Sequence, residues 1–274
     1  MAALCVDENE GPLAVVAADR MVTYGGFIEF EHTVPKIVQP DSRAVILIAG
    51  DTLIGTRLAK AVAAGFGGTS PGIHSIAERM AAGYGELRTK QIEEQILVPR
   101  GLDLPNYYRH QTDLAPQLAM MLDQSMANHN PGIELLIAGV DGTGAHIYSV
   151  HNPGPSEVEH DVIGYAAIGS GGIHALQAMI SFRHSASAGL RETLFRVYAS
   201  KRRAEVAPGV GVDTDMAIVS ASEVRFLSAR VLAELAALYS DYGKAAEAVQ
   251  VQELGKLSLE ENGSDGDDDT GSAS

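Results

Sequence analysis

An acid, a base and a glycine stand at the ends of apolar runs near the start of the chain. Residues 13–18 are apolar and lead directly into Asp19, while the nearly continuous apolar run 43–49 ends at Gly50, and Lys36 lies between the two runs. A charge at the end of such a run must be exposed, hydrogen-bonded or paired. Lys36 is the nearest partner for Asp19 that follows a turn. We therefore expect a buried pair, which either fixes the core or prepares the lysine for proton transfer.

Composition places the chain among soluble globular proteins. Its 274 residues are 46% hydrophobic and 20% charged, which is ordinary for a globular domain. The single cysteine, Cys5, excludes an internal disulfide framework and fits a reducing compartment. No stretch approaches the roughly 18 apolar residues of a membrane span, and the first residues are acidic where a signal peptide is basic. We expect a cytoplasmic protein that is not bound to a membrane.

The charge distribution argues against several classes of partner. The formal net charge is −15, and the six acids after Leu257 leave −9 on the rest of the chain. A domain this acidic, with no basic stripe, is a poor nucleic-acid binder. Residues 257–274 are polar and acidic, so we predict a disordered tail there. The histidines are scattered without metal-ligand spacing, and we expect neither a metal nor a cofactor.

Strands and helices are expected in blocks. The sequence predicts an opening hairpin from residues 2–6 and 13–18, a buried strand over 43–49, and then helices over 73–98 and 107–126. A second hairpin, residues 134–140 and 145–150, and a strand over 162–168 follow. This order favours antiparallel sheets with helices packed outside, an α+β layered sandwich. We expect one domain over 1–256, with a helical insertion at about 70–128 and a C-terminal helix at about 222–250.

Four motifs in this order resemble a known family. The run Ala17-Ala18-Asp19-Arg20 is followed by Thr23, Lys36 lies 17 residues after Asp19, Gly50 lies 14 residues further on, and residues 169–171 read Gly-Ser-Gly. Each motif alone is common. Together, and separated by helices, they resemble the proteasome-type branch of the N-terminal-nucleophile hydrolases over roughly residues 2–220.

This resemblance implies a four-layer αββα sandwich and acyl transfer at an N-terminal threonine, in a peptidase subunit that assembles into a self-compartmentalising ring. It implies that Lys36 tunes the nucleophile, that Asp19 orients the lysine, and that Gly50 donates its N–H to the oxyanion. Ser170 would complete the hydrogen-bond network. The substrate-binding positions it implies are Thr23, Gly50, Thr52 and Gly171. Its implied partners are further copies of the chain or related subunits, a polypeptide substrate and an ATPase or other regulator.

The chain departs from the family at the nucleophile. The first threonine is Thr23, beyond the second expected strand, so no hydroxyl stands at the start of the first strand. Three explanations compete. A threonine lies upstream of Met1; the chain is an inactive, structural ring subunit; or Cys5 is the nucleophile of a small-molecule amidase.

A second departure lies at residues 205–209, between the expected strand over 162–168 and a last expected strand over 212–220. The family commonly has Asp-x-x-Ser-Gly there, whereas this chain has Glu205-Val206-Ala207-Pro208-Gly209. Glu205 keeps the charge on a longer side chain, and Pro208 removes a hydroxyl and an N–H. We therefore assign Glu205 only a weak catalytic role.

Overall fold

Two five-stranded antiparallel sheets form the centre of this computed structural model, which describes residues 1–24, 28–31, 36–67 and 71–257, without the side chains of 22–24 and 28–29. The first sheet has the strand order β10 (Tyr165–Ala166), β1 (Ala2–Asp7), β2 (Gly11–Asp19), β11 (Thr214–Val219), β12 (Val224–Phe226). The second has the order β5 (Ile37–Asp41), β6 (Ala44–Gly50), β7 (Ile133–Asp141), β8 (Gly144–Val150), β9 (Val158–Glu159). Strands β3 (Met21–Tyr24) and β4 (Ile28–Glu31) form a separate pair.

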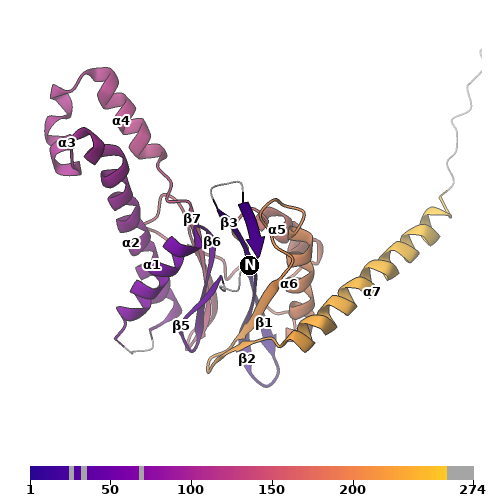
Figure 1. Ribbon diagram of the computed structural model, residues 1–274. Helices are drawn as coiled ribbons and strands as arrows, with labels where there is room; N and C mark the ends of the chain where they lie inside the picture. The colour runs from indigo at the N-terminus through magenta and orange to yellow at the C-terminus, as the bar shows by residue number, and fades with distance from the viewer. Residues whose placement is uncertain (25–27, 32–35, 68–70, 258–274) are drawn as a thin grey trace, which may run out of the picture.

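Seven α-helices in the described part of the chain cover the sheets or extend from them (Figure 1). They are α1 (Thr52–Ala64), α2 (Ile73–Ile92), α3 (Leu104–His110), α4 (Pro116–Asn128), α5 (Gly172–Ser181), α6 (Leu190–Ala204) and α7 (Ala229–Leu254). Helices α1 and α2 pack on the second sheet, and α6 packs on the first. The expected α+β class is confirmed, and this layering is compatible with a sandwich.

Side-chain alternation along β1 separates two of the cores. Ala2 and Leu4 face the second sheet and join a cluster between the sheets, whereas Ala3 and Cys5 face the helices and join Met179 and Val197. Successive residues of a strand point to opposite faces, so both sides of β1 must be apolar when both are covered. This explains why β1 and β2 are nearly continuous apolar runs.

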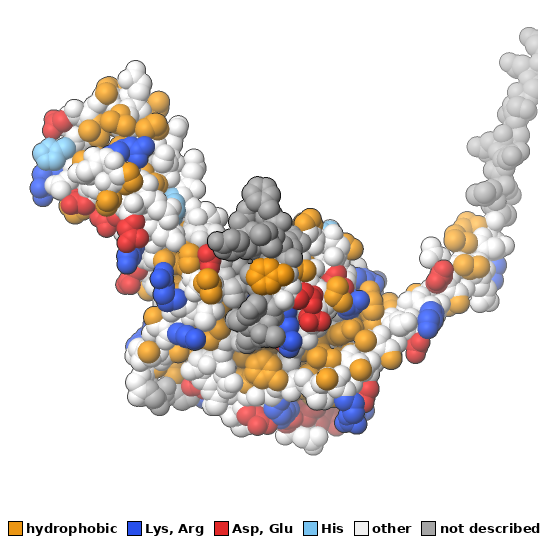
Figure 2. All heavy atoms as spheres, in the orientation of Figure 1, with side chains coloured by type: hydrophobic (Ala, Val, Ile, Leu, Met, Phe, Trp, Pro, Cys, Tyr) orange, Lys and Arg blue, Asp and Glu red, His pale blue; other side chains and the backbone are white. Residues whose placement is uncertain are grey.

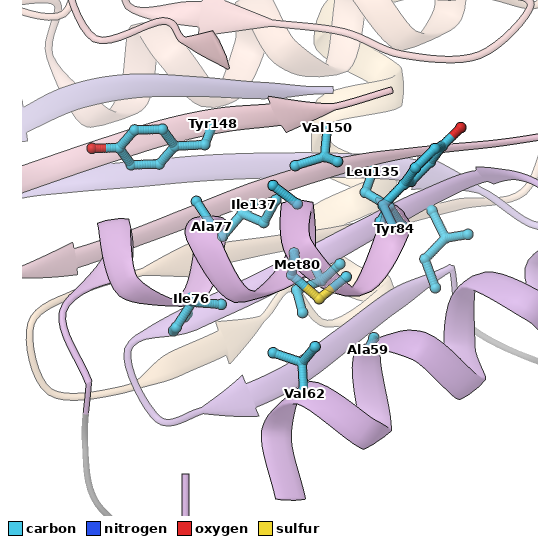
Figure 3. Close-up of a cluster of buried hydrophobic side chains, with 14 of the residues drawn as sticks. Ala59, Val62, Ile76, Ala77, Met80, Tyr84, Leu135, Ile137, Tyr148 and Val150 are labelled. Atoms are coloured by element: carbon cyan, nitrogen blue, oxygen red, sulfur yellow. The ribbon is translucent and has the colours of Figure 1, made fainter. Parts of the chain in front are cut away.

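The helix pair α1 and α2 closes the outer face of the second sheet. Figure 3 shows Met80 of α2 between Val62 of α1 and the strand residues Ile137 and Val150. Tyr84 is fully buried there and donates its hydroxyl to the carbonyl of Ile133, at 3.1 Å. The polar end of the tyrosine is thereby satisfied while its ring adds to the core.

The expected helix over 107–126 is two helices. Pro116 is the first residue of α4, and α3 ends at His110, with a short 3-10 turn between them. Proline lacks the N–H that a helix interior needs but suits its first turn. Together with the end of α2, these helices form an arm with its own small core around Leu97, Tyr107 and Leu122 (Figure 1).

Two other expected elements are shifted. The C-terminal helix begins at Ala229, later than the expected position of about 222, because residues 224–226 pair with β11 as β12. It ends at Leu254. Of the expected strand over 162–168, only Tyr165–Ala166 pairs, against β1, since a turn occupies residues 161–164. The predicted disordered tail, apart from Leu257, lies outside the described residues.

Candidate functional site

A cavity of about 1050 Å³ opens where the two sheets and the start of α5 meet. Its walls include Asp19 and Lys36, and its remaining lining is mostly small or apolar. Residues of all four motifs, which are far apart in the sequence, line this cavity together with Thr52, an expected substrate-binding residue: Asp19, Lys36, Gly50, Ser170 and Gly171. Large, mostly apolar cavities with a few convergent polar groups are the usual form of a ligand site.

Asp19 and Lys36 form the expected pair. Lys36 Nζ lies 2.7 Å from Asp19 Oδ1, and the two side chains are 12% and 19% exposed. The same oxygen accepts the Met21 N–H at 2.8 Å and the Gly211 N–H at 3.4 Å. The carboxylate at the end of β2 is therefore satisfied from three directions, which is what a mostly buried charge requires.

The amino end of β1 reaches the same cavity. Met1 continues the ladder with β2: its nitrogen donates to the Ala17 carbonyl at 2.8 Å, and the Ala17 N–H donates back at 2.9 Å. Although Met1 as a residue is partly exposed, its nitrogen is buried. This burial lowers the pKa of the amino group to about 5; Asp19 opposes the shift, and Lys36 adds to it. An amine in this position is neutral at pH 7 and can accept a proton.

Gly50 ends β6 in a conformation that suits glycine. Its φ is +83°, and a Cβ there would lie 2.0 Å from the Gly132 carbonyl oxygen. That oxygen also accepts the Asp51 N–H at 3.0 Å. Asp51 then caps α1, accepting the N–H groups of Leu53 and Ile54. The close approach of residues 50 and 132 places the first turn of α1, with Thr52, on the cavity wall.

The Gly-Ser-Gly turn is held by a side chain from the second sheet. Gly169 has a φ of +80° and donates its N–H to Glu134 Oε2 at 2.7 Å. Ser170 is exposed to the cavity, and Gly171 fits against Ala204, where a Cβ would come within 2.9 Å. Glu134 thus links β7 to the start of α5, a role that sequence reasoning missed because Glu134 is the first residue of an expected apolar strand.

The remaining predicted residues lie elsewhere. Cys5 is 1% exposed under α6, on the face of β1 opposite the second sheet, and burial raises the pKa of its thiol to about 11. Glu205 does not line the cavity; it pairs with Lys201 at 2.7 Å and Arg202 at 3.0 Å. Thr23 lies in β3 opposite Glu29, and its side chain lies outside the described residues.

Lys201 is a cavity residue that sequence reasoning also missed. It is 4% exposed and lies in the last turn of α6. The only sequence signal was its position four residues before Glu205, since the run of Lys201, Arg202 and Arg203 is typical of a solvated helix C-terminus.

The chain matches no protein-family model, and no curated protein aligns with it significantly. Within the described residues, no three His, Cys, Asp or Glu side chains converge on a possible metal position. No helix in this part of the chain is both long and apolar enough to cross a membrane.

Proposed function

We propose that this chain has the proteasome-type N-terminal-nucleophile fold and is a subunit of a self-compartmentalising peptidase. One observation carries the proposal: the amino end of β1, the Lys36–Asp19 pair, Gly50 and Ser170 all line a single cavity. The peptidase chemistry needs a nucleophile at the amino end of a strand, a base beside it, and donors for the oxyanion.

In the proposed reaction, a hydroxyl on the residue at the amino end of β1 attacks the peptide carbonyl carbon. Its proton passes to the terminal amine and then to the departing amine of the cleaved peptide, leaving an acyl ester on the protein. Water hydrolyses this ester in the second half of the reaction. Lys36 stabilises the developing negative charge, and the backbone N–H of Gly50 stabilises the oxyanion.

The β1–β2 ladder indicates where that hydroxyl would stand. Met1 lies beside Ala17, so a residue added before Met1 would lie beside Ala18, and a second one beside Asp19. Successive residues of a strand point to opposite faces, so a threonine at only one of these two positions would direct its hydroxyl toward the Lys36–Asp19 pair.

The first experiment is N-terminal sequencing of the protein purified from its natural source, combined with hydrolysis of fluorogenic peptides. We expect an N-terminal threonine and turnover that is lowered by about 100- to 1000-fold in the Lys36→Met variant. Recombinant chains with a threonine one or two residues before Met1 are the matched tests, each with alanine in place of the threonine as its control. If neither extended chain hydrolyses or is acylated by peptide electrophiles, the catalytic proposal fails.

A non-catalytic ring subunit of the same fold is the second candidate. It is favoured by Glu205, which does not line the cavity and whose carboxylate is paired with Lys201 and Arg202, and by Pro208, which has no N–H. This candidate predicts ring assembly without hydrolysis in every form of the chain. Analytical ultracentrifugation tests the ring itself, because a stable monomer contradicts both candidates. The amidase using Cys5 is not supported, since the thiol is buried away from the cavity.

A further inference from the structure

Lys201 is a buried ammonium whose hydrogen bonds all go to one short segment. Its Nζ donates to Glu205 Oε1 at 2.7 Å, to the Gly211 carbonyl at 2.8 Å and to the Val212 carbonyl at 2.7 Å. These three acceptors use all three of its protons. Burial lowers the pKa of Lys201, and Glu205 opposes that shift. A buried charge this fully bonded is costly to remove or to move.

The segment that Lys201 holds forms a wall of the candidate site. Pro208, Gly209 and Val210 line the cavity. Val212 and Asp213 donate their N–H groups to Glu31 Oε1, at 2.6 and 2.9 Å. Residues 208–213 are therefore fixed from α6 on one side and from β4 on the other.

Gly211 connects this segment to the pair in the cavity. Its carbonyl accepts from Lys201, and its N–H donates to Asp19 Oδ1, the same oxygen that binds Lys36. The backbone of β3 lies close against Gly211, since a Cβ there would come within 3.1 Å of the Met21 nitrogen. Gly211 therefore has little freedom to move. A shift of the Gly211 carbonyl would therefore displace a donor from Asp19.

We propose that Lys201 is a positioning residue, which holds Asp19 and Lys36 in place through Gly211. The charged groups around it are Arg202 on its own helix, Glu205 at the C-cap of that helix and Asp19 at the end of β2, with Glu31 of β4 and Asp213 also close enough to feel its charge. A catalytic purpose for this arrangement rests on the proposed function. The effect of Lys201 on the local state of Lys36 is independent of that function.

The test compares the full-length chain with its Lys201→Met variant, without requiring turnover. Acetylation of each lysine by acetic anhydride is measured at a fixed pH by peptide mass spectrometry, together with hydrogen exchange of residues 209–213. We expect Lys201→Met to change the acetylation rate of Lys36 at least threefold relative to exposed Lys60, and to speed exchange at 209–213 at least tenfold. Lys201→Arg should restore part of both effects, because a guanidinium can donate to the same acceptors.

Val197→Ala is the matched control for a general loss of stability. Val197 is fully buried in the same helix but faces the first sheet, so its truncation should lower stability without a selective effect on Lys36. If Lys201→Met changes Lys36 no more than Val197→Ala does, the proposal is overturned.

Gly211→Ala is the second variant, and it decides the outcome where Lys201→Met fails to fold. It displaces Gly211 while leaving Lys201 intact and should reproduce the effect on Lys36. Unchanged Lys36 acetylation in this variant would overturn the connection through Gly211. If the protein hydrolyses no peptide but the acetylation rate of Lys36 changes as expected, the proposed peptidase function is contradicted and the role of Lys201 is supported.

Discussion

Single carboxylates organise much of the described structure by collecting backbone N–H groups. Asp19 binds Lys36 and two backbone amides at the cavity, and Asp141 likewise accepts backbone N–H groups at the end of β7 away from the cavity. Asp141 accepts the Ile73 N–H at the start of α2 and the Thr143 N–H in the β7–β8 turn. Each of these carboxylates joins segments that the chain itself keeps far apart.

Asp141 yields a prediction for the pH dependence of stability. Burial by itself would raise the pKa of this carboxyl, but hydrogen bonds from Thr143 and Ile73, with the nearby His146, lower it from 3.8 to about 2. A lowered folded-state pKa contributes stability above about pH 4, which is lost as the pH falls toward 2. Asp141→Asn should therefore cost about 1 to 2 kcal/mol at pH 7, allowing for solvent screening.

Urea denaturation of the wild type and the Asp141→Asn variant at pH 7, 4 and 2.5 measures this difference. The gap between their free energies of unfolding should narrow as the pH falls. If the two free energies of unfolding differ by the same amount at all three pH values, the lowered pKa of Asp141 is not the cause of the difference.

At the scale of elements, close packing of α2 on the second sheet depends on a glycine in β7. A Cβ on Gly139 would lie 2.5 Å from Ile73 Cδ1 and 2.7 Å from the Arg43 carbonyl oxygen. Ile73 begins α2, and Arg43 precedes β6. The space that a methyl group on Gly139 would need is thus occupied by Ile73 of α2 and by the backbone of Arg43, just before β6.

Gly139→Ala should destabilise the fold by about 2 to 3 kcal/mol, because the backbone at Arg43 cannot move aside as a side chain could. Gly142→Ala is the matched control: it lies in the adjacent turn, where a Cβ would meet nothing within 4 Å. Urea titration of both variants measures the effect. Equal stabilities would show that α2 can shift on the sheet without cost.

At the scale of the whole molecule, α7 extends well beyond the domain. Its first half packs through Leu235, which is 8% exposed, whereas Val249, Val251 and Leu254 are each more than half exposed. Figure 1 shows the helix projecting from the body, and Figure 2 shows apolar side chains along it. Most of the stabilising contact therefore comes from residues before Gly243.

Ending the chain after Gly243 should leave the free energy of unfolding of the isolated subunit within about 0.5 kcal/mol of the full-length value. Leu235→Ala should lower it by about 2 to 4 kcal/mol through loss of a buried side chain. Thermal and urea unfolding of both forms test this contrast. A strongly destabilised truncated subunit would mean that the outer half of α7 packs against the domain.

The part of the site that could be predicted from the sequence followed from the free-energy cost of burying a charge and from the spacing of apolar residues. A carboxylate after an apolar run needs a partner, and Lys36 proved to be that partner at 2.7 Å. The alternation of apolar and polar stretches predicted the hairpin β1–β2 and the buried β6. The helix expected over 107–126 is interrupted, because Pro116 lacks the N–H that a helix interior needs and instead begins α4.

Amino-acid sequence by itself determined the class of the fold, the acidic balance and the pairing of Asp19 with Lys36, because these depend on composition, periodicity and the cost of burying a charge. Tertiary structure alone decided that Lys201 is buried, that Glu134 meets Gly169, and that Cys5 faces α6 instead of the cavity. The physical reason is that a strand or helix has several faces, and only the packing of distant elements determines which face is covered and by what.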